Sequence, residues 1–436
     1  MSTNTYLKDI KQTSMKPLHV NPLKLSQPMG ATLAFLGIKN CMPLMHGAQG
    51  CASFTKVLFT RHFNDPIAIQ TTAVNDITAV IDGGERGISE AIENITKKVT
   101  PDLVGLFTTG MTETKGDDIK GASLLLQEKQ KIVYVHTPDF EGGLESGWAL
   151  SVQNIIVQLV EPATHIKKDK VVLIPNVNMS PIEVEKLKEA LELLDLEVYA
   201  LPDLSDSLDG HLGVKQGALS GGGIEVRDIE KLGNAGLVMS IGRSVKKCGE
   251  LFCEKNPQTR HLHFDSLIGL EASDDFYTQL LAYTGAKSVP NVIKRWRARL
   301  QDVLLDTHFM LGRAKIVIAD EPDSAYGMSK ALSEAGAKCE NFISQRSEIS
   351  EAFTCNVRVG DFEDVECVLP HCDMLIANFH GERLAHHHHK ALLIRGFPNY
   401  EQVGIGLRHN ILYEGSSLFL CEVANLLVHH QSSHPK

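Results

Sequence analysis

Short runs of consecutive apolar residues alternate along this chain with longer segments in which apolar residues recur every three or four positions. The run Leu103–Thr108 is followed by helical spacing over Ile119–Gln130, and a second run occupies Ile132–His136. Short apolar runs bounded by turn residues predict buried strands, whereas the wider spacing predicts amphipathic helices. Strand, helix and strand in this order predict an α/β protein with mostly parallel sheets. The loop Thr109–Asp118, which contains Gly110, is then expected at the carboxyl end of its strand, where such sheets usually bind ligands.

This alternation occurs three times and divides the chain into three α/β domains. At about 150 residues per domain, a chain of 436 residues suits that number. We expect a flexible N-terminal arm at residues 1–21, a first α/β domain at 22–166 and a second at 167–289. A connecting helix at 290–311 then leads to a third α/β domain at 312–436, which ends in a C-terminal helix.

Two helices and one linker have clear local signals. Ser180–Glu183 combines an N-cap serine, a proline at the first helical position and a capping-box glutamate, so a helix is predicted to follow. Pro290–Leu311 carries one apolar stripe and is predicted as the connecting helix. Near its end, Asp306 and His308 are expected to hydrogen-bond to the next sheet rather than to catalyse a reaction. The charged segment Lys167–Lys170 is predicted to link the first domain to the second.

The composition narrows the class of partners. The 43 Lys and Arg residues against 53 Asp and Glu give a formal net charge of −10, which gives no support to nucleic-acid binding. No apolar run approaches the roughly 18–20 residues of a membrane span, and Met1–Thr13 lacks the apolar core of a signal peptide. The 9 cysteines are odd in number and scattered, which is typical of a reducing cytoplasm rather than of a disulfide framework.

One cysteine lies inside a turn framed by glycines. Pro43 is expected to end the element before the turn. Gly47 and Gly50 tolerate unusual backbone angles and let other atoms approach closely. Cys51 follows directly, so the turn would present its side chain to whatever binds there.

The residues after this turn have helical spacing. Phe54, Val57 and Leu58 recur at intervals of three and four, which predicts that Cys51 lies near a helix N-terminus. Unpaired N–H groups and the positive end of the helix dipole would favour the thiolate there, and a thiolate is the form that binds a soft metal centre. A small packing cysteine beside a tight turn remains the alternative interpretation.

The segment Leu44–Cys51, together with Ser26–Gly30 and Arg61–Phe63, resembles the cluster-cysteine signature of the nitrogenase component 1 family. Further similar segments are Thr108–Met111, His136–Pro138, Pro202–Leu204, Asp306–Met310 and Gly360–Asp361. The resemblance extends from about Pro22 to the C-terminus. It implies three Rossmann-like domains of the nitrogenase component 1 type, and within the family the chain is most similar to the β-like subunit of the cofactor-maturation scaffold.

The resemblance also implies which residues bind metal. The catalytic β subunits of the family hold their large cluster with cysteines at the positions matching Ser26, Cys51 and Gly110, and only Cys51 is a cysteine here. A cubane needs about four thiolates, so the resemblance implies that Cys51 is the single ligand of this chain to a [4Fe–4S] cluster. The remaining ligands would come from the partner subunit. These substitutions indicate a scaffold rather than a reducing enzyme, with no catalytic residues.

The family resemblance carries a set of expected partners. It implies an α2β2 heterotetramer with an α-like subunit of the NifE type, with the [4Fe–4S] cluster at the subunit interface. The precursor of the iron–molybdenum cofactor would be bound by the complex, mainly in the partner subunit. It would come from a NifB-type donor, mature with the nitrogenase Fe protein and pass to apo-dinitrogenase. The alternatives are the β subunit of a nitrogenase-like reductase (dinitrogenase or dark protochlorophyllide reductase) and, more distantly, a cluster-free α/β protein that binds small molecules.

Other motifs compete with this interpretation. Gly221–Gly223 belongs to no phosphate-binding motif after a strand, so it is weak evidence for a nucleotide. The pairs Cys248 with Cys253 and Cys367 with Cys372 lack the two-residue spacing of a zinc knuckle and are expected to pack.

Three further features stay open. The run His386–His389 is expected to be a solvated helix or loop, with capture of a divalent metal as the alternative. Cys41 is a spare thiolate that the resemblance does not require. The long glycine-rich segment Ser205–Gly223 is expected to be a functional or mobile loop.

Overall fold

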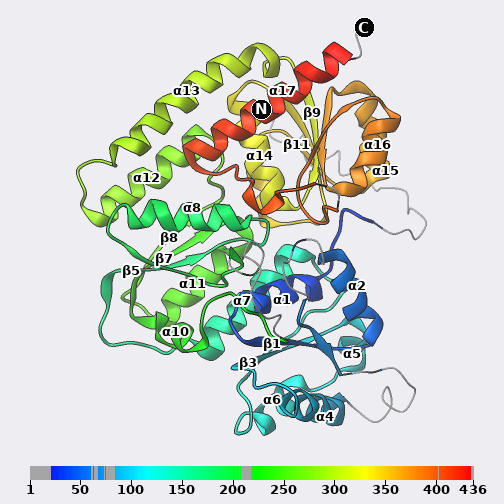
Figure 1. Cartoon of the computed structure of the whole chain (residues 1–436), viewed down its shortest axis with the longest axis vertical. Coiled ribbons are helices and arrows are strands. Elements are labelled where there is room, and N and C mark those ends of the chain that lie inside the picture. The colour runs from blue at the N-terminus through cyan, green and yellow to red at the C-terminus, as the bar shows by residue number, and fades with distance from the viewer. Residues whose placement is uncertain are drawn as a thin grey trace, which may run out of the picture.

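A computed structural model of the chain describes residues 21–59, 62, 67–72, 74, 84–205, 207, 218–400 and 402–433. The predicted N-terminal arm lies almost entirely outside these residues, as do Arg61, Phe63 and most of the segment 206–217. Figure 1 shows three α/β units, each built around its own sheet, with the first unit drawn in blue and cyan. Within the described residues, no helix is both long and apolar enough to cross a lipid bilayer.

The first sheet has the strand order β2-β1-β3-β4, and its strands are parallel. Its strands are β1 (Cys41–His46), β2 (Gln70–Thr71), β3 (Leu103–Thr108) and β4 (Ile132–Val135). Its helices are α1 (Gln27–Leu36), α2 (Gln49–Phe59), α4 (Gly84–Thr96), α5 (Gly110–Lys115), α6 (Ile119–Leu126) and α7 (Leu144–Leu159). The strand order reverses between β1 and β3, so the carboxyl ends of these two strands form the topological switch point of the sheet.

The second sheet has the order β6-β5-β7-β8 and is also parallel. Its strands are β5 (Lys167–Ile174), β6 (Glu197–Ala200), β7 (Ala235–Ile241) and β8 (Arg260–Phe264). Its helices are α8 (Pro181–Glu192), α10 (Val226–Glu230), α11 (Lys246–Lys255) and α12 (Leu270–Thr284). The predicted capping box is present at α8, where the Ser180 N–H donates to Glu183 Oε2 at 2.9 Å.

The third sheet has the order β11-β10-β9-β12-β13 and is parallel. Its strands are β9 (Lys315–Asp320), β10 (Lys338–Ile343), β11 (Asn356–Val359), β12 (Met374–Ala377) and β13 (Ala391–Ile394). Its helices are α14 (Pro322–Glu334), α15 (Phe362–Val368), α16 (Glu382–His387) and α17 (Leu412–Ser433). The long helix α13 (Asn291–Leu311) leads into this unit and lies beside α17 (Figure 1). His308 on α13 contacts the Ala335 carbonyl at 3.1 Å, as the hydrogen-bonding prediction expects.

Both faces of the second sheet are buried, and the core on each face extends into one of the other two units. Val172 and Ile174 point into a core shared with α1 and α7 of the first unit. Val171 and Leu173, which alternate with them, point into a core shared with α14 and α17 of the third unit. Successive side chains of a strand face opposite sides of a sheet, so one buried strand joins all three units.

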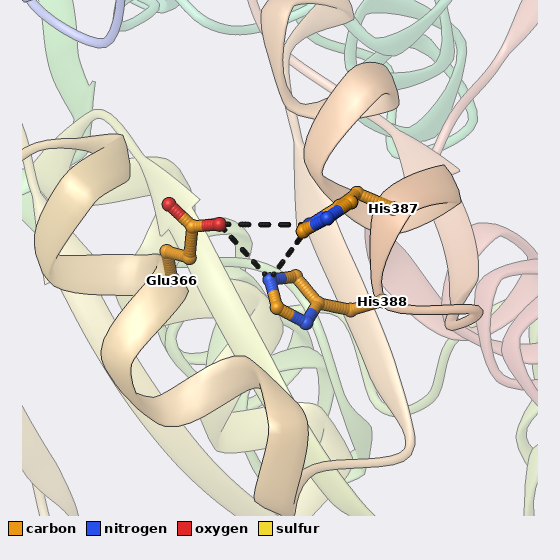
Figure 2. Close-up of side chains that lie close together, drawn as sticks. All are labelled: Glu366, His387 and His388. Carbon is orange, nitrogen blue, oxygen red and sulfur yellow. Dashed lines mark hydrogen bonds and ion pairs between the residues drawn. The ribbon is translucent and has the colours of Figure 1, made fainter.

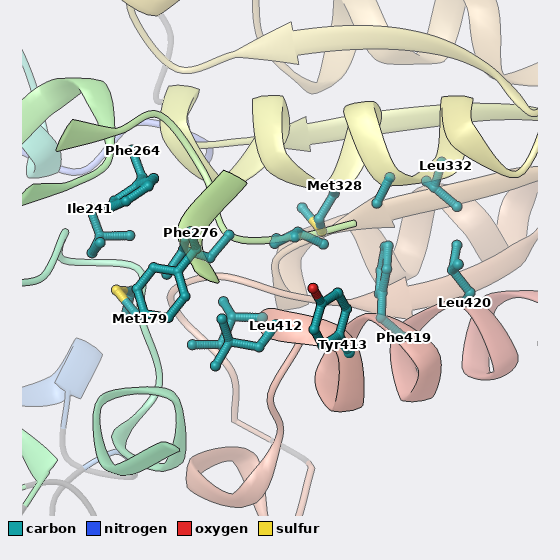
Figure 3. Close-up of a cluster of buried hydrophobic side chains, with 14 of the residues drawn as sticks. Met179, Ile241, Phe264, Phe276, Met328, Leu332, Leu412, Tyr413, Phe419 and Leu420 are labelled. Carbon is teal, nitrogen blue, oxygen red and sulfur yellow. The ribbon is translucent and has the colours of Figure 1, made fainter. Parts of the chain in front are cut away.

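Figure 3 shows how closely the second and third units pack. The residues labelled there are Met179, Ile241, Phe264 and Phe276 from the second unit and Met328, Leu332, Leu412, Tyr413, Phe419 and Leu420 from the third. Tyr413 stacks on Tyr277 of α12 with ring centroids 5.3 Å apart, and its hydroxyl donates to Asp274 at 2.7 Å. These contacts make the second and third units one continuous body.

Three local predictions were wrong. Lys167–Lys170 forms the first half of β5 instead of a linker, because its backbone pairs with β6 and β7. Pro43 lies inside β1, which is possible because the two-residue strand β2 pairs only with Leu44 and Met45. The segment Thr109–Asp118 is not simply a loop, since Thr109 caps the short helix α5.

Candidate cluster-ligand site

Cys51 and Gly110 lie at the switch point of the first sheet. Cys51 is the third residue of α2, which follows β1, and Gly110 is the first residue of α5, which follows β3. The two strands pair in register from Cys41 with Leu103 to His46 with Thr108, so both helices begin at the same edge. Ligands of open α/β sheets bind at such an edge, and the predicted position of Cys51 near a helix N-terminus is confirmed.

The turn before Cys51 is held by a buried histidine. His46 Nε2 lies 2.9 Å from Asp117 Oδ2, and its Nδ1 lies 2.8 Å from the Thr72 hydroxyl. The Thr109 and Thr112 hydroxyls both donate to the His46 carbonyl, at 3.1 and 2.9 Å. Burial lowers the pKa of His46, and Asp117 opposes this shift. Ring and carbonyl together fix the end of β1 against α5, which positions the start of α2.

The two glycines before Cys51 differ in the space available for a side chain. A Cβ on Gly47 would lie 2.7 Å from the Thr109 side chain, so the close packing of the two turns requires its absence. A Cβ on Gly50 would meet nothing within 4 Å. The chain itself therefore gives no steric reason for Gly50, and the free space beside it lies next to Cys51.

The thiol of Cys51 is exposed, yet its pKa is raised. Surrounding protein atoms remove part of its water, and the negative charge of Asp139 disfavours a second negative charge. Backbone N–H groups of the helix start act in the opposite direction but are outweighed. The helix start therefore favours the thiolate, as predicted, but burial and Asp139 outweigh this effect in the free chain.

Exposed apolar side chains lie on α2, which carries this thiol, and beside the start of α5. Phe54 and Val57, three and six residues after Cys51 on α2, are 75% and 65% exposed, and the helix buries Ala52, Thr55 and Phe59 instead. Phe140 is 63% exposed, and its ring would lie 3.3 Å from a Cβ on Gly110. Together with Met111, these side chains form what we call the Cys51 surface: Cys51, Phe54, Val57, Met111 and Phe140. Exposed apolar patches on proteins are typical of sites that bind another molecule.

Ser26, the third position of the family pattern, begins α1. It is the N-cap residue of that helix. The next residue, Gln27, donates to the Ser146 hydroxyl at 3.1 Å, near the loop that carries Asp139. The structure thus places all three family positions at helix starts in the first unit. Of the three residues, a serine, a cysteine and a glycine, only the cysteine carries a thiol.

The other cysteines do not join this site. Cys41 is fully buried at the opposite end of β1, and a six-residue strand spans about 17–20 Å, so it is no spare ligand for the Cys51 position. Cys248 is buried and Cys253 donates to the Thr259 carbonyl at 3.2 Å, as expected for packing cysteines. Cys372 is buried as well, whereas Cys367 is exposed on α15, so the packing prediction was wrong for that residue.

Sequence reasoning missed a group of buried carboxyls where the three units meet. Glu145 from α7 accepts hydrogen bonds from the Asp323 N–H at 2.9 Å and from Asn178 at 2.7 Å. Asp323 in turn accepts from the Ser244 hydroxyl at 2.6 Å. Both carboxyl oxygens of Glu321 lack a hydrogen-bond partner among the described residues, as does the nearby Ser344 hydroxyl. Burial and the neighbouring acids raise the pKa of Glu321 to about 8.

Comparison with known proteins defines the class. The sequence profile of the family described as nitrogenase component 1 type oxidoreductase matches residues 26–428. A solved structure of nitrogenase Cp1 at pH 6.5 superimposes with a TM-score of 0.91 at 27% identity, covering 98% of this chain and 97% of that chain. The chain therefore belongs to the nitrogenase component 1 family, and the predicted fold class is confirmed.

Particular members of the family are similar over nearly the whole chain. A nitrogenase iron-molybdenum cofactor biosynthesis protein NifN from Rippkaea orientalis is 35% identical, covering 96% of each chain. The NifN protein of Bradyrhizobium diazoefficiens is 36% identical over 96% of this chain and 91% of its own. That of Klebsiella pneumoniae is 34% identical over 98% and 95%. The predicted resemblance to a protein of iron–molybdenum cofactor maturation is thus confirmed.

Proposed function

We propose that this chain is the β-like subunit of a scaffold complex on which the precursor of the nitrogenase iron–molybdenum cofactor is matured. In this role Cys51 is the single ligand that the chain contributes to a [4Fe–4S] cluster, and the remaining ligands come from a NifE-type α-like partner. The observation that carries the proposal is an exposed cysteine at a sheet switch point, together with the exposed apolar side chains of the Cys51 surface.

The chain supplies about one of the four thiolates that such a site needs. Within the described part of the chain, no group of three or more possible metal ligands includes Cys51. A cubane needs about four thiolates, so a second subunit has to supply the rest. Phe54, Val57 and Phe140 provide apolar area for that subunit to bury, and the free space beside Gly50 allows its close approach.

The raised pKa of Cys51 also suits binding at an interface. A metal centre binds the thiolate and drives deprotonation itself, so a high pKa in the free chain does not prevent ligation. It keeps the free thiol less reactive until the partner is bound, because the thiolate is the nucleophilic form. When bound, the cluster supplies one-electron redox chemistry to the complex.

The names of the relatives support the rest of the proposal. Proteins called NifN serve biosynthesis of the iron–molybdenum cofactor. By the same resemblance, the complex is an α2β2 heterotetramer that holds the precursor mainly in the partner subunit. It receives the precursor from a NifB-type donor, works with the nitrogenase Fe protein and delivers to apo-dinitrogenase. The subunit by itself has no turnover, and the complex works in the cytoplasm.

The test compares the chain alone with the chain co-produced with its NifE-type partner, both without oxygen. We expect little iron in the single subunit and a paramagnetic cubane signal after reduction in the pair. A full complement of cluster iron in the isolated chain would overturn the shared site.

The similarity to nitrogenase Cp1 favours a second candidate function, that of the β subunit of a reductase. Serine and glycine at positions 26 and 110 argue against the large cluster of such enzymes. Acetylene reduction by the complex with Fe protein and ATP, at a rate comparable to dinitrogenase, would favour the reductase instead.

A further inference from the structure

A group of metal-binding side chains lies far from Cys51, in the third unit. Figure 2 shows Glu366 of α15 facing His387 at the end of α16 and His388 directly after it. His388 Nε2 lies 3.1 Å from Glu366 Oε1, and His387 Nδ1 lies 3.7 Å from the same oxygen. The two ring nitrogens are 3.4 Å apart. Among the described residues, this is the group in which three possible ligand atoms lie within 4.8 Å of one another.

These distances match the shape of a coordination site. Ligand atoms about 2.0–2.1 Å from a tetrahedral zinc ion lie about 3.3 Å from one another. The observed sides of 3.1, 3.4 and 3.7 Å define a triangle with a circumradius of about 2.0 Å. One ion at or slightly above its centre reaches all three atoms at bonding distance, with little movement of the side chains.

The backbone around the histidines is fixed. The Lys390 N–H donates to the Ala385 carbonyl at 2.9 Å and the His389 N–H to the His386 carbonyl at 3.2 Å, which is the Schellman pattern of a helix end. His389 has the left-handed φ of 49° that this pattern places after the helix. The hydrogen-bonded turn therefore holds the backbone of His387 and His388 in one defined conformation.

The helix that carries Glu366 is fixed as well. At its start, Asp361 accepts from the N–H groups of Glu363 and Asp364, at 2.9 and 3.1 Å. Val365, next to Glu366, packs in the same core cluster as Ala385 of α16. Both ligand-bearing helices thus rest on one core, and rigid elements are what a precise metal site requires.

The four consecutive histidines do not act alike. His386 faces away from Glu366 and lines a shallow hollow of about 310 Å³ with His429 and His430, over an apolar floor. Its ring lies 3.8 Å from Glu382 on its own helix. Of the run, His387 and His388 therefore lie at metal-binding distance from Glu366, and His386 does not belong to this group.

We propose that Glu366, His387 and His388 form a surface site for a divalent transition metal of the zinc class, with water at the remaining position. Imidazole and carboxylate ligands at tetrahedral spacing suit Zn²⁺, and an open fourth position is typical of sites that are not purely structural. The ion replaces the hydrogen bond between Glu366 and His388 and the longer contact between Glu366 and His387. Each ring must offer the lone pair of one nitrogen to the ion.

The test measures Zn²⁺ binding to the full-length chain by titration calorimetry. The variants Glu366→Gln, His387→Asn and His388→Asn each remove one ligand with little change of shape, and each is expected to weaken the tight site at least about tenfold. The matched control is His386→Asn, which removes a histidine of the same run and is expected to change the affinity less than about twofold. Circular dichroism checks that every variant is folded.

A second readout distinguishes a built site from loose adsorption. Zn²⁺ that binds the folded chain is expected to raise the unfolding temperature of the wild type and of His386→Asn, but not of the three ligand variants. The proposal is wrong if a ligand variant binds Zn²⁺ as tightly as the wild type, or if His386→Asn loses as much affinity as they do. These outcomes are independent of cluster iron at Cys51, so they leave the proposed scaffold function to its own test.

Discussion

Replacing Gly30 with alanine should loosen the packing that positions the whole first unit. Gly30 on α1 faces α7, and an added Cβ would lie 2.1 Å from the Leu144 carbonyl oxygen and 2.6 Å from the Trp148 nitrogen. Real Cβ atoms essentially never approach closer than 3.0 Å, so the two helices would have to separate by about 1 Å. Both contacts are backbone atoms and cannot turn aside, and Trp148 is fully buried behind them.

The magnitude follows from two opposing effects. Alanine in a helix gains about 1 kcal/mol over glycine. Overpacking of a close-packed core costs about 1–3 kcal/mol, and two rigid backbone contacts place Gly30→Ala at or above the upper end. We therefore expect a net loss of about 2 kcal/mol or more in the free energy of unfolding.

The assay is urea unfolding of the full-length chain followed by circular dichroism. Gly50→Ala on α2 is the matched control, because a Cβ there meets nothing within 4 Å and should leave the midpoint unchanged or slightly higher. If Gly30→Ala unfolds at the same urea concentration as Gly50→Ala, the close approach of α1 and α7 does not require glycine at position 30.

Three further changes test the chemistry. Glu321→Gln removes a buried carboxyl whose raised pKa makes the folded state hold a proton that the unfolded state releases. Between about pH 5 and 8 the wild type should therefore lose up to about 1.4 kcal/mol of stability per pH unit relative to the variant, and urea midpoints with equal slopes against pH would contradict this. Burial and, after it, the charge of Asp139 raise the pKa of Cys51, so Asp139→Asn removes part of the shift and alkylation of the Cys51 peptide in the cluster-free chain should begin at lower pH; an unchanged profile in mass spectrometry would exclude that role of Asp139. Alanines at His386–His389 should abolish the proposed zinc site yet leave cluster iron and cofactor maturation near normal, and a large loss of maturation in a folded variant would show that the run serves the scaffold itself.

Local signals were sufficient for much of the fold. The apolar run Leu103–Thr108 is β3, and the capping box at Ser180 begins α8, because both depend on residues adjacent in sequence. Lys167–Lys170 was mistaken for a linker because its charges dominate the pattern, whereas long-range pairing with β6 and β7 decides its structure. Pro43 was mistaken for a strand breaker for the same reason, since only the partner strands show that its missing N–H is not needed.

The candidate site was predictable in position but not in character. The glycines and helical spacing around Cys51 are visible in sequence, so its place at a helix start could be inferred. The exposure of Phe54 and Val57 could not, because an apolar stripe looks the same whether it faces the core of its own chain or a partner. The raised pKa of Cys51 comes first from burial and then from the charge of Asp139, which lies 88 positions further along the sequence. Glu366 likewise meets the histidine run only through tertiary packing.

The central claim is that Cys51 alone carries this chain's share of an interfacial cluster. Its most direct test is the iron content and paramagnetic resonance of the co-produced complex, purified without oxygen from cells that lack the precursor donor. Cys51→Ala removes one of four thiolates and should lose most of the roughly four iron atoms per pair of unlike subunits, together with the cubane signal. Ser26→Ala and Gly110→Ala remove no thiolate and should keep both. A wild-type iron content and spectrum in Cys51→Ala would contradict the account.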